Sequence, residues 1–132
     1  MQNLRTITKD SPKIELDVAY VGTGGNTGEG KYFFSYDPNV VIVVESGIDM
    51  SIFLTDATAE SIGIGDFITS DALNQIASYA IASDGRSVTF HNTNTDPYVI
   101  QVVLMLHDTD AKHPNVGIVC DPQVINRPRP PQ

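Results

Sequence analysis

Hydrophobic and polar residues alternate with a period of two along most of this chain. The alternation is regular over residues 13–20 and returns over residues 32–36, with a glycine-rich stretch at residues 22–30 between them. Period-two alternation is typical of β-strands that bury one face. These two strands are expected to form a hairpin, with the glycine-rich stretch as its loop.

Further strands are predicted in the middle of the chain. Residues 40–44 are a continuous β-branched run, which is typical of a strand covered on both faces. Residues 48–55 alternate again. The pair Asp84-Gly85 separates two β-favouring runs at 78–83 and 86–91, and it predicts a two-residue hairpin turn.

The C-terminal half contains the most apolar run, at residues 98–106, which predicts a central strand. A polar loop over residues 107–115 follows, and residues 116–120 predict a short last strand. Residues 56–75 lack a clear period and indicate an irregular connection. A short helical turn over residues 70–76, capped by Ser70, is the alternative at the end of this connection.

Many short strands separated by turn signals predict an all-β fold, an antiparallel β-sandwich or barrel of about seven strands. We assign residues 1–12 to an N-terminal arm and residues 13–126 to one β-sandwich domain. Residues 127–132 form a proline-rich tail, which cannot continue a strand ladder because proline lacks the backbone donor. At 132 residues the chain is long enough to bury a core without a metal or disulfide.

Charge and composition narrow the function classes. Sixteen acidic residues against eight basic ones give a formal charge of −8, which disfavours nucleic acid and anionic membranes as partners. The N-terminus has no apolar run typical of a signal peptide, and no apolar run is long enough to span a bilayer. Cys120 is the single cysteine, so we expect a protein of the cytoplasm; a phage or secretion-apparatus component that leaves the cell without a signal peptide is the alternative.

The best ligand-like cluster lies in the loop at residues 107–113. His107, Asp108, Asp110 and His113 supply two imidazoles and two carboxylates, which are ligands for a divalent cation. Their spacing matches no metal motif, and loop residues of these types also favour turns. We therefore assign no metal, no cofactor and no catalytic residue, and keep a cation or carbohydrate site at this loop as an alternative.

Other motifs carry little chemistry. The glycine-rich stretch at 22–30 precedes a strand rather than a helix, unlike a phosphate-binding loop. The chain has no Gly-x-Ser-x-Gly motif, and Cys120 ends an apolar strand where an inert buried thiol is expected. His91 is expected to be a surface residue or one whose hydrogen bonds are satisfied, rather than a catalyst. The tail at 128–131 is similar to a polyproline ligand, although an extended terminus is the simpler interpretation.

The C-terminal segment Asp121-Pro122-Gln123-Val124-Ile125-Asn126-Arg127-Pro128 resembles that of the DP-EP family of small bacterial proteins. Asp121-Pro122 matches the first element of the family motif, whereas Arg127-Pro128 replaces its Glu-Pro element. The resemblance implies an immunoglobulin-like β-sandwich and transfers no catalytic residue. From the residues themselves, Val124 and Ile125 are expected to anchor the tail on the sandwich.

The sequence favours a non-enzymatic binding or assembly module. Its partner is expected to be another protein or a second copy of the chain, so a homo-oligomer is possible. A cation- or carbohydrate-binding sandwich using residues 107–113 is the first alternative. A small hydrolase with an unrecognised site is the second.

Overall fold

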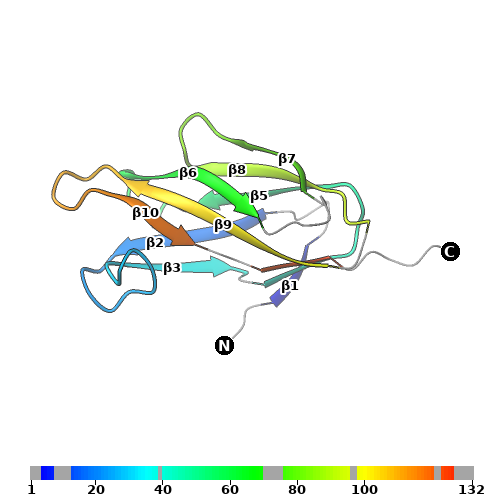
Figure 1. Ribbon diagram of the computed structural model, residues 1–132, viewed down its shortest axis with the longest axis horizontal. Helices are drawn as coiled ribbons and strands as arrows, with labels where there is room; N and C mark the ends of the chain where they lie inside the picture. Colours follow the sequence, from blue (N-terminus) through cyan, green and yellow to red (C-terminus); the bar gives the residue numbers. More distant parts are fainter. Residues whose placement is uncertain are drawn as a thin grey trace.

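The computed structural model describes residues 4–7, 13–38, 40–69, 76–95, 98–120 and 123–126. These ranges contain eleven β-strands, arranged in two sheets that pack against each other (Figure 1). No helix capable of crossing a membrane occurs in them. The prediction of an all-β sandwich is confirmed, with more strands than the seven or so expected.

The first sheet is built around its longest strand, β9. Its strand order is β1-β4-β11-β9-β10, and β6 pairs with the opposite edge of β9. The central position expected for the most apolar run is therefore confirmed. The bounds of these strands are Leu4–Ile7 for β1, Val40–Val43 for β4, Ile62–Thr69 for β6, Tyr98–Asp108 for β9, Asn115–Cys120 for β10 and Gln123–Asn126 for β11.

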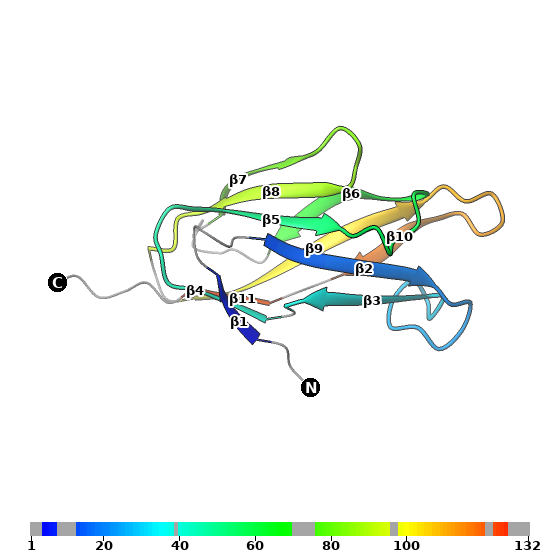
Figure 2. The same ribbon diagram turned by 180° about the vertical axis from the view of Figure 1, so that it is seen from behind.

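The second sheet has the order β3-β2-β5-β8-β7, and Figure 2 shows it from the side opposite to Figure 1. Its β2–β3 and β7–β8 pairs are the two expected hairpins. Most strand pairs in the molecule are antiparallel, while β1–β4, β4–β11 and β2–β5 are parallel. The bounds are Lys13–Tyr20 for β2, Tyr32–Asp37 for β3, Ile48–Leu54 for β5, Ile76–Ile81 for β7 and Ser87–Asn92 for β8.

Side chains that alternate in the sequence line the space between the sheets. Every second residue is buried from Ile14 to Val18 of β2, along β5 and β8, and from Val102 to Asp108 of β9, because successive side chains of a strand point to opposite faces. The continuous run of β4 is buried on both faces, as its composition predicts, since Val40, Val41 and Val43 are all shielded from solvent. One apolar core thus holds both sheets.

The irregular connection expected over residues 56–75 is wrong for its central part, which forms β6. The alternation is interrupted there because a β-bulge shifts the register between Ile64 and Asp66. Buried side chains consequently fall at Ile62, Ile64 and Phe67 rather than at a constant spacing of two. The helical turn considered at residues 70–76 lies mostly outside the described residues, and Ile76 begins β7.

The two-residue turn expected at Asp84-Gly85 is also wrong, although the hairpin that it joins is present. Gly85 alone of the pair has a positive φ, 71°, whereas a type I′ turn requires it at both residues. Gly85 N donates to Ala82 O, and Ala82 N donates to Ser87 O, so the loop is longer. The Asp84 carboxylate accepts from Arg86 N within this loop.

Both terminal segments contribute short strands to the first sheet. Residues 4–7, inside the expected N-terminal arm, form β1 and pair with β4, and Ile7 is fully buried. Val124 of β11 is also fully buried, so the expectation that it anchors the C-terminal segment is confirmed. The Asp121-Pro122 motif and the tail at 127–132 lie outside the described residues.

Candidate functional site

The loop between β9 and β10 does bring together the carboxylates and the imidazole noted in the sequence. Asp108 is the last residue of β9, and its buried Oδ2 accepts a 2.6 Å hydrogen bond from Tyr32 Oη. His113 Nδ1 lies 3.1 Å from the same oxygen, and His113 Nε2 lies 3.5 Å from Asp110 Oδ2. We call Tyr32, Asp108, Asp110 and His113 the loop cluster.

Burial and hydrogen bonding set the ionisation of this cluster in opposite directions. Burial opposes the charge on Asp108, but hydrogen bonds from Tyr32, Ser61 and the Asp110 amide together hold its pKa below the usual value. Burial, followed by the hydrogen bond to Asp108, raises the pKa of Tyr32 well above its ordinary value. The stable arrangement is therefore a carboxylate that accepts from a neutral phenol.

The polar atoms of the loop cluster are directed at one another rather than at an open site. The His113 ring also stacks on Tyr20, with centroids 3.7 Å apart and planes inclined by 3°. In the part of the chain that the structure describes, no group of three or more His, Cys, Asp or Glu side chains is arranged to hold a metal ion. The cluster ties the β9–β10 loop to β3 and the end of β2.

His107 lies apart from the loop cluster, although it is adjacent to Asp108 in sequence. Its ring rests on the glycines of β6: a Cβ atom at Gly63 would lie 3.0 Å from His107 Nε2, and one at Gly65 would lie 3.2 Å from Nδ1. Neighbouring residues of a strand point to opposite faces, so Asp108 is buried while His107 faces outward. The four candidates at 107–113 therefore do not form one site.

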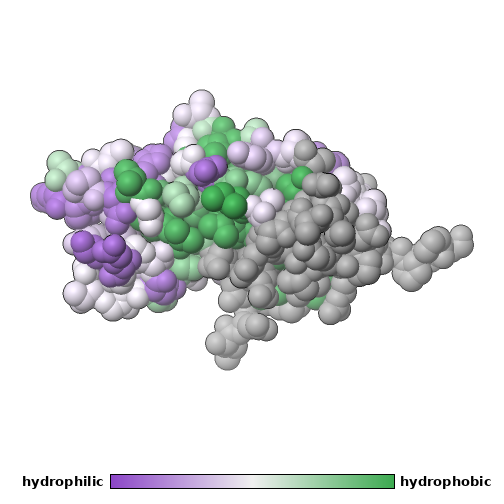
Figure 3. Space-filling model, in the orientation of Figure 1, coloured by the Kyte–Doolittle hydropathy of each residue, from purple (hydrophilic) through white to green (hydrophobic). Residues whose placement is uncertain are grey.

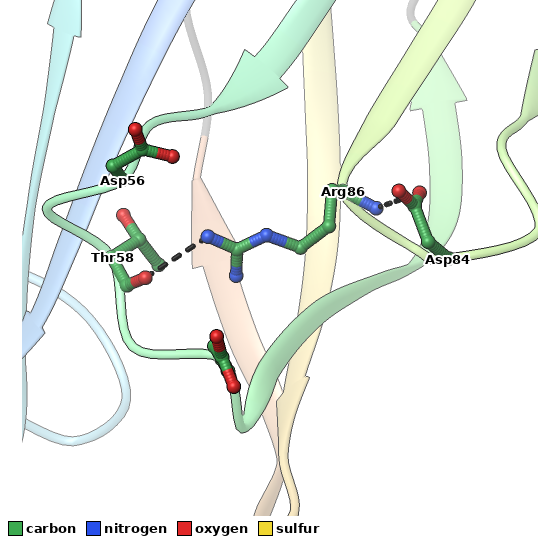
Figure 4. Close-up of a pocket in the computed structure, with 5 residues that line it drawn as sticks. Asp56, Thr58, Asp84 and Arg86 are labelled. Atoms are coloured by element: carbon green, nitrogen blue, oxygen red, sulfur yellow. Dashed lines mark hydrogen bonds between the residues drawn. The ribbon is translucent and has the colours of Figure 1, made fainter.

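A second polar region surrounds Arg86, the last residue of the β7–β8 loop. Figure 4 shows Arg86 extending toward Thr58 and the segment between β5 and β6, beside a cavity of about 470 Å³. Its guanidinium donates to four backbone carbonyls, at 2.8 to 3.1 Å; these belong to Thr55, Thr58, Ala59 and Ile62. Arg86 is thus occupied in fixing this segment rather than available for an anionic ligand.

The glycine-rich loop between β2 and β3 serves to cover a sheet edge. Thr27 Oγ1 donates to Val119 O and accepts from Val119 N, so it occupies both outward-facing backbone groups of that β10 residue. Gly25 allows the loop to close tightly, because a Cβ atom there would lie 2.0 Å from Tyr32 O.

An apolar patch lies on the outer face of the first sheet. Ile68 is 50% exposed, Val116 is 84% exposed and Val119 is 40% exposed, while Val103 and Met105 between them are half-buried. Ile68 pairs with Val103, and Val119 pairs with Met105, so these side chains form one patch across β6, β9 and β10. Figure 3 shows hydrophobic residues gathered over these strands. We call the five residues the apolar face.

A shallow groove of about 340 Å³ crosses one end of the apolar face, where Asp66, Met105, His107 and Val116 meet. The outer face of the second sheet has a different character, with the exposed residues Glu15 and Asp17 on β2 and Asp49 on β5. Phe33 of β3, which pairs with Ala19, is also 50% exposed on that outer face, so the two faces differ in how their apolar side chains are grouped. A contiguous apolar patch, as on the first sheet, is a feature of contact surfaces. The sequence analysis does not identify the apolar face, because Ile68 lies in β6, a strand that the sequence pattern does not predict.

The remaining sequence candidates have structural roles. His91 Nδ1 lies 2.7 Å from Asp49 Oδ1 on the outer face of the second sheet, as expected for a surface residue. Cys120 is fully buried, as expected for an inert thiol. The sequence matches no protein-family model and no curated protein. The resemblance to the DP-EP family therefore stays a prediction.

Proposed function

We propose that this protein is a non-enzymatic β-sandwich module that binds another protein through its apolar face. The observation that carries the proposal is the exposure of Ile68, Val116 and Val119 beside half-buried Val103 and Met105 on one sheet. Soluble domains seldom leave such a contiguous patch uncovered, because each buried Å² of apolar surface contributes about 25 cal/mol. A partner that covers this patch recovers that free energy.

The edges beside the apolar face favour docking on the face over addition of a strand. Thr27 occupies the outward backbone groups of Val119 on the β10 edge. On the β6 edge, Ile64 N donates to Gly85 O in the β7–β8 loop at 2.7 Å. Exposed strand edges are templates for pairing, and loops that cover them suppress it. A partner therefore gains most by packing its own side chains onto the sheet.

The placement of the nucleophile and base candidates supports a role without catalysis. His91 and His113 pair with carboxylates, and His107 has no polar partner among the described residues. Cys120, the only thiol, is buried. A cation site at the loop cluster would require Asp108 to exchange the Tyr32 hydrogen bond for a metal bond, so binding to the apolar face is the better-supported function.

The proposal predicts that Met105→Glu releases the protein from a larger complex. Met105 lies at the centre of the apolar face, and docking would bury the new carboxylate without a counter-charge, a cost of several kcal/mol. Ser51→Glu is the matched control, because Ser51 is also half-buried on a middle strand but faces outward from the second sheet. The measurement is the native size of tagged protein in an extract of its own cells.

Wild type and Ser51→Glu are expected to elute together, well above the 14.3 kDa of a monomer, and Met105→Glu close to it. Both variants are first shown to be folded by their thermal transitions. Elution of all three proteins at the monomer position contradicts the proposed function.

A further inference from the structure

The partner of the apolar face can be inferred from the charges around it. The chain carries a formal charge of −8, so two copies repel each other wherever their carboxylates meet. Among the side chains that the structure describes, the exposed carboxylate of Asp66 and the imidazole of His107 border the apolar face. Two identical chains can therefore approach through this face while most of their acidic residues stay in solvent.

Asp66 and His107 are free to form contacts with a partner. Asp66 Oδ1 accepts from Phe67 N, its own neighbour, and the Asp66 side chain is otherwise exposed. His107 has no hydrogen bond or ion pair within the described residues, because its ring lies against Gly63 and Gly65. The Asp66 carboxylate is a hydrogen-bond acceptor, and the His107 imidazole can donate. In a symmetric dimer, Asp66 of each copy can therefore pair with His107 of the other copy.

The strand register fixes how two copies would have to cross. Asp66 pairs with Met105 on the neighbouring strand, and His107 lies two residues beyond Met105 along β9. These displacements are perpendicular and similar, about 5 Å across strands and about 7 Å along one. Consider a two-fold axis that lies parallel to the sheet above Met105 and halfway between the directions from Met105 to Asp66 and to His107. This axis carries Asp66 of one copy onto the position of His107 in the other, so each His107 lies over Asp66 of the second copy.

We infer that the apolar face is the contact surface of a two-fold homodimer in which the first sheets of two copies pack with crossed strands. Near-perpendicular strand directions are one of the two common ways in which sheets pack face to face. Self-complementary pairs are a property of every two-fold interface. The inference rests on the proposed function and adds the identity of the partner.

Exchanging the two polar residues tests this inference. Asp66→His alone and His107→Asp alone each place like groups opposite each other, so each is expected to weaken the dimer by roughly tenfold in Kd. The double variant restores opposite groups and is expected to return Kd to within about threefold of wild type. Sedimentation equilibrium of the purified proteins at pH 6 gives these constants.

The pair Asp49 and His91, on the outer face of the second sheet, is the matched control. The same exchange there is expected to leave the dimerisation constant unchanged.

A cross-linking measurement tests the dimer independently, in case a variant with exchanged residues fails to fold. Met105 lies on the inferred axis, so Met105→Cys is expected to cross-link to itself through a short bis-maleimide, more efficiently than the more exposed Val116→Cys.

A purified protein that is monomeric at every concentration, or a double variant as weak as the single ones, overturns the homodimer. If Met105→Glu still reduces the size of the protein in cell extract, the proposed binding function stands with a different partner. If neither the purified protein nor the extract shows association through this face, the homodimer and the proposed function both fail.

Discussion

Replacing Arg86 with methionine is expected to lower the free energy of unfolding by about 3 kcal/mol. The Arg86 guanidinium satisfies four carbonyl oxygens between Thr55 and Ile62, and methionine keeps the aliphatic part of the side chain but none of these donors. The carbonyls must then be hydrated or left unpaired. Chemical denaturation monitored by tyrosine fluorescence measures the difference.

Two further variants separate this role from a general effect of charge. Arg5 forms an exposed ion pair with Asp37, with both side chains about half exposed, so Arg5→Met is expected to cost less than about 1 kcal/mol. Arg86→Lys is expected to recover only part of the stability, because an ammonium group cannot reach carbonyls on both sides as a planar guanidinium does. Equal losses for Arg5→Met and Arg86→Met would contradict the structural role of Arg86.

Asp108→Asn is expected to destabilise the protein by about 2 kcal/mol at pH 7 and to reduce its sensitivity to acid. The asparagine amide can accept from Tyr32 but carries no charge to attract His113. The pKa of Asp108 is lower in the folded protein than in the unfolded chain, so its contribution is complete above about pH 4. It is lost as pH falls through the folded-state pKa.

The stability of wild type and Asp108→Asn is compared by urea denaturation between pH 7 and pH 2. The difference between them is expected to shrink below about pH 4, because protonated Asp108 no longer differs in charge from asparagine. Asp56→Asn is the control, since Asp56 is exposed and no hydrogen bond or ion pair engages its side chain in the described structure. A difference that stays constant down to pH 2 would disprove the stabilising role of the Asp108 charge.

The regular alternation of the sequence predicts much of the fold because each sheet buries one face. β8 is indicated instead by its β-favouring run beside Asp84-Gly85, and β9 by its continuous apolar run; the alternation is sufficient for β2, β3 and β5. It fails at β6, where one bulge changes the spacing of the buried residues between Ile64 and Phe67. It also misses β1, whose four residues are too few to show a period and are held by pairing with β4. Such short strands depend on tertiary contacts rather than on local pattern.

The candidate sites were less predictable, because they depend on contacts between distant residues. The sequence indicates Asp108, Asp110 and His113, but Tyr32 enters the loop cluster from 76 residues away and satisfies the carboxylate. The apolar face was hidden for a related reason. The continuous apolar run of β9 does not distinguish its inner side chains from Val103 and Met105, which face outward.

The rate at which hydrogen peroxide oxidises Met105 tests the central claim, that the apolar face is covered when the protein functions. Mass spectrometry measures the sulfoxide at Met105, with fully buried Met50 as the internal reference. The account predicts that Met105 oxidises at least threefold more slowly in concentrated extract of its own cells than in dilute purified protein. Equal rates in the two conditions would show that the face stays open and would contradict the account.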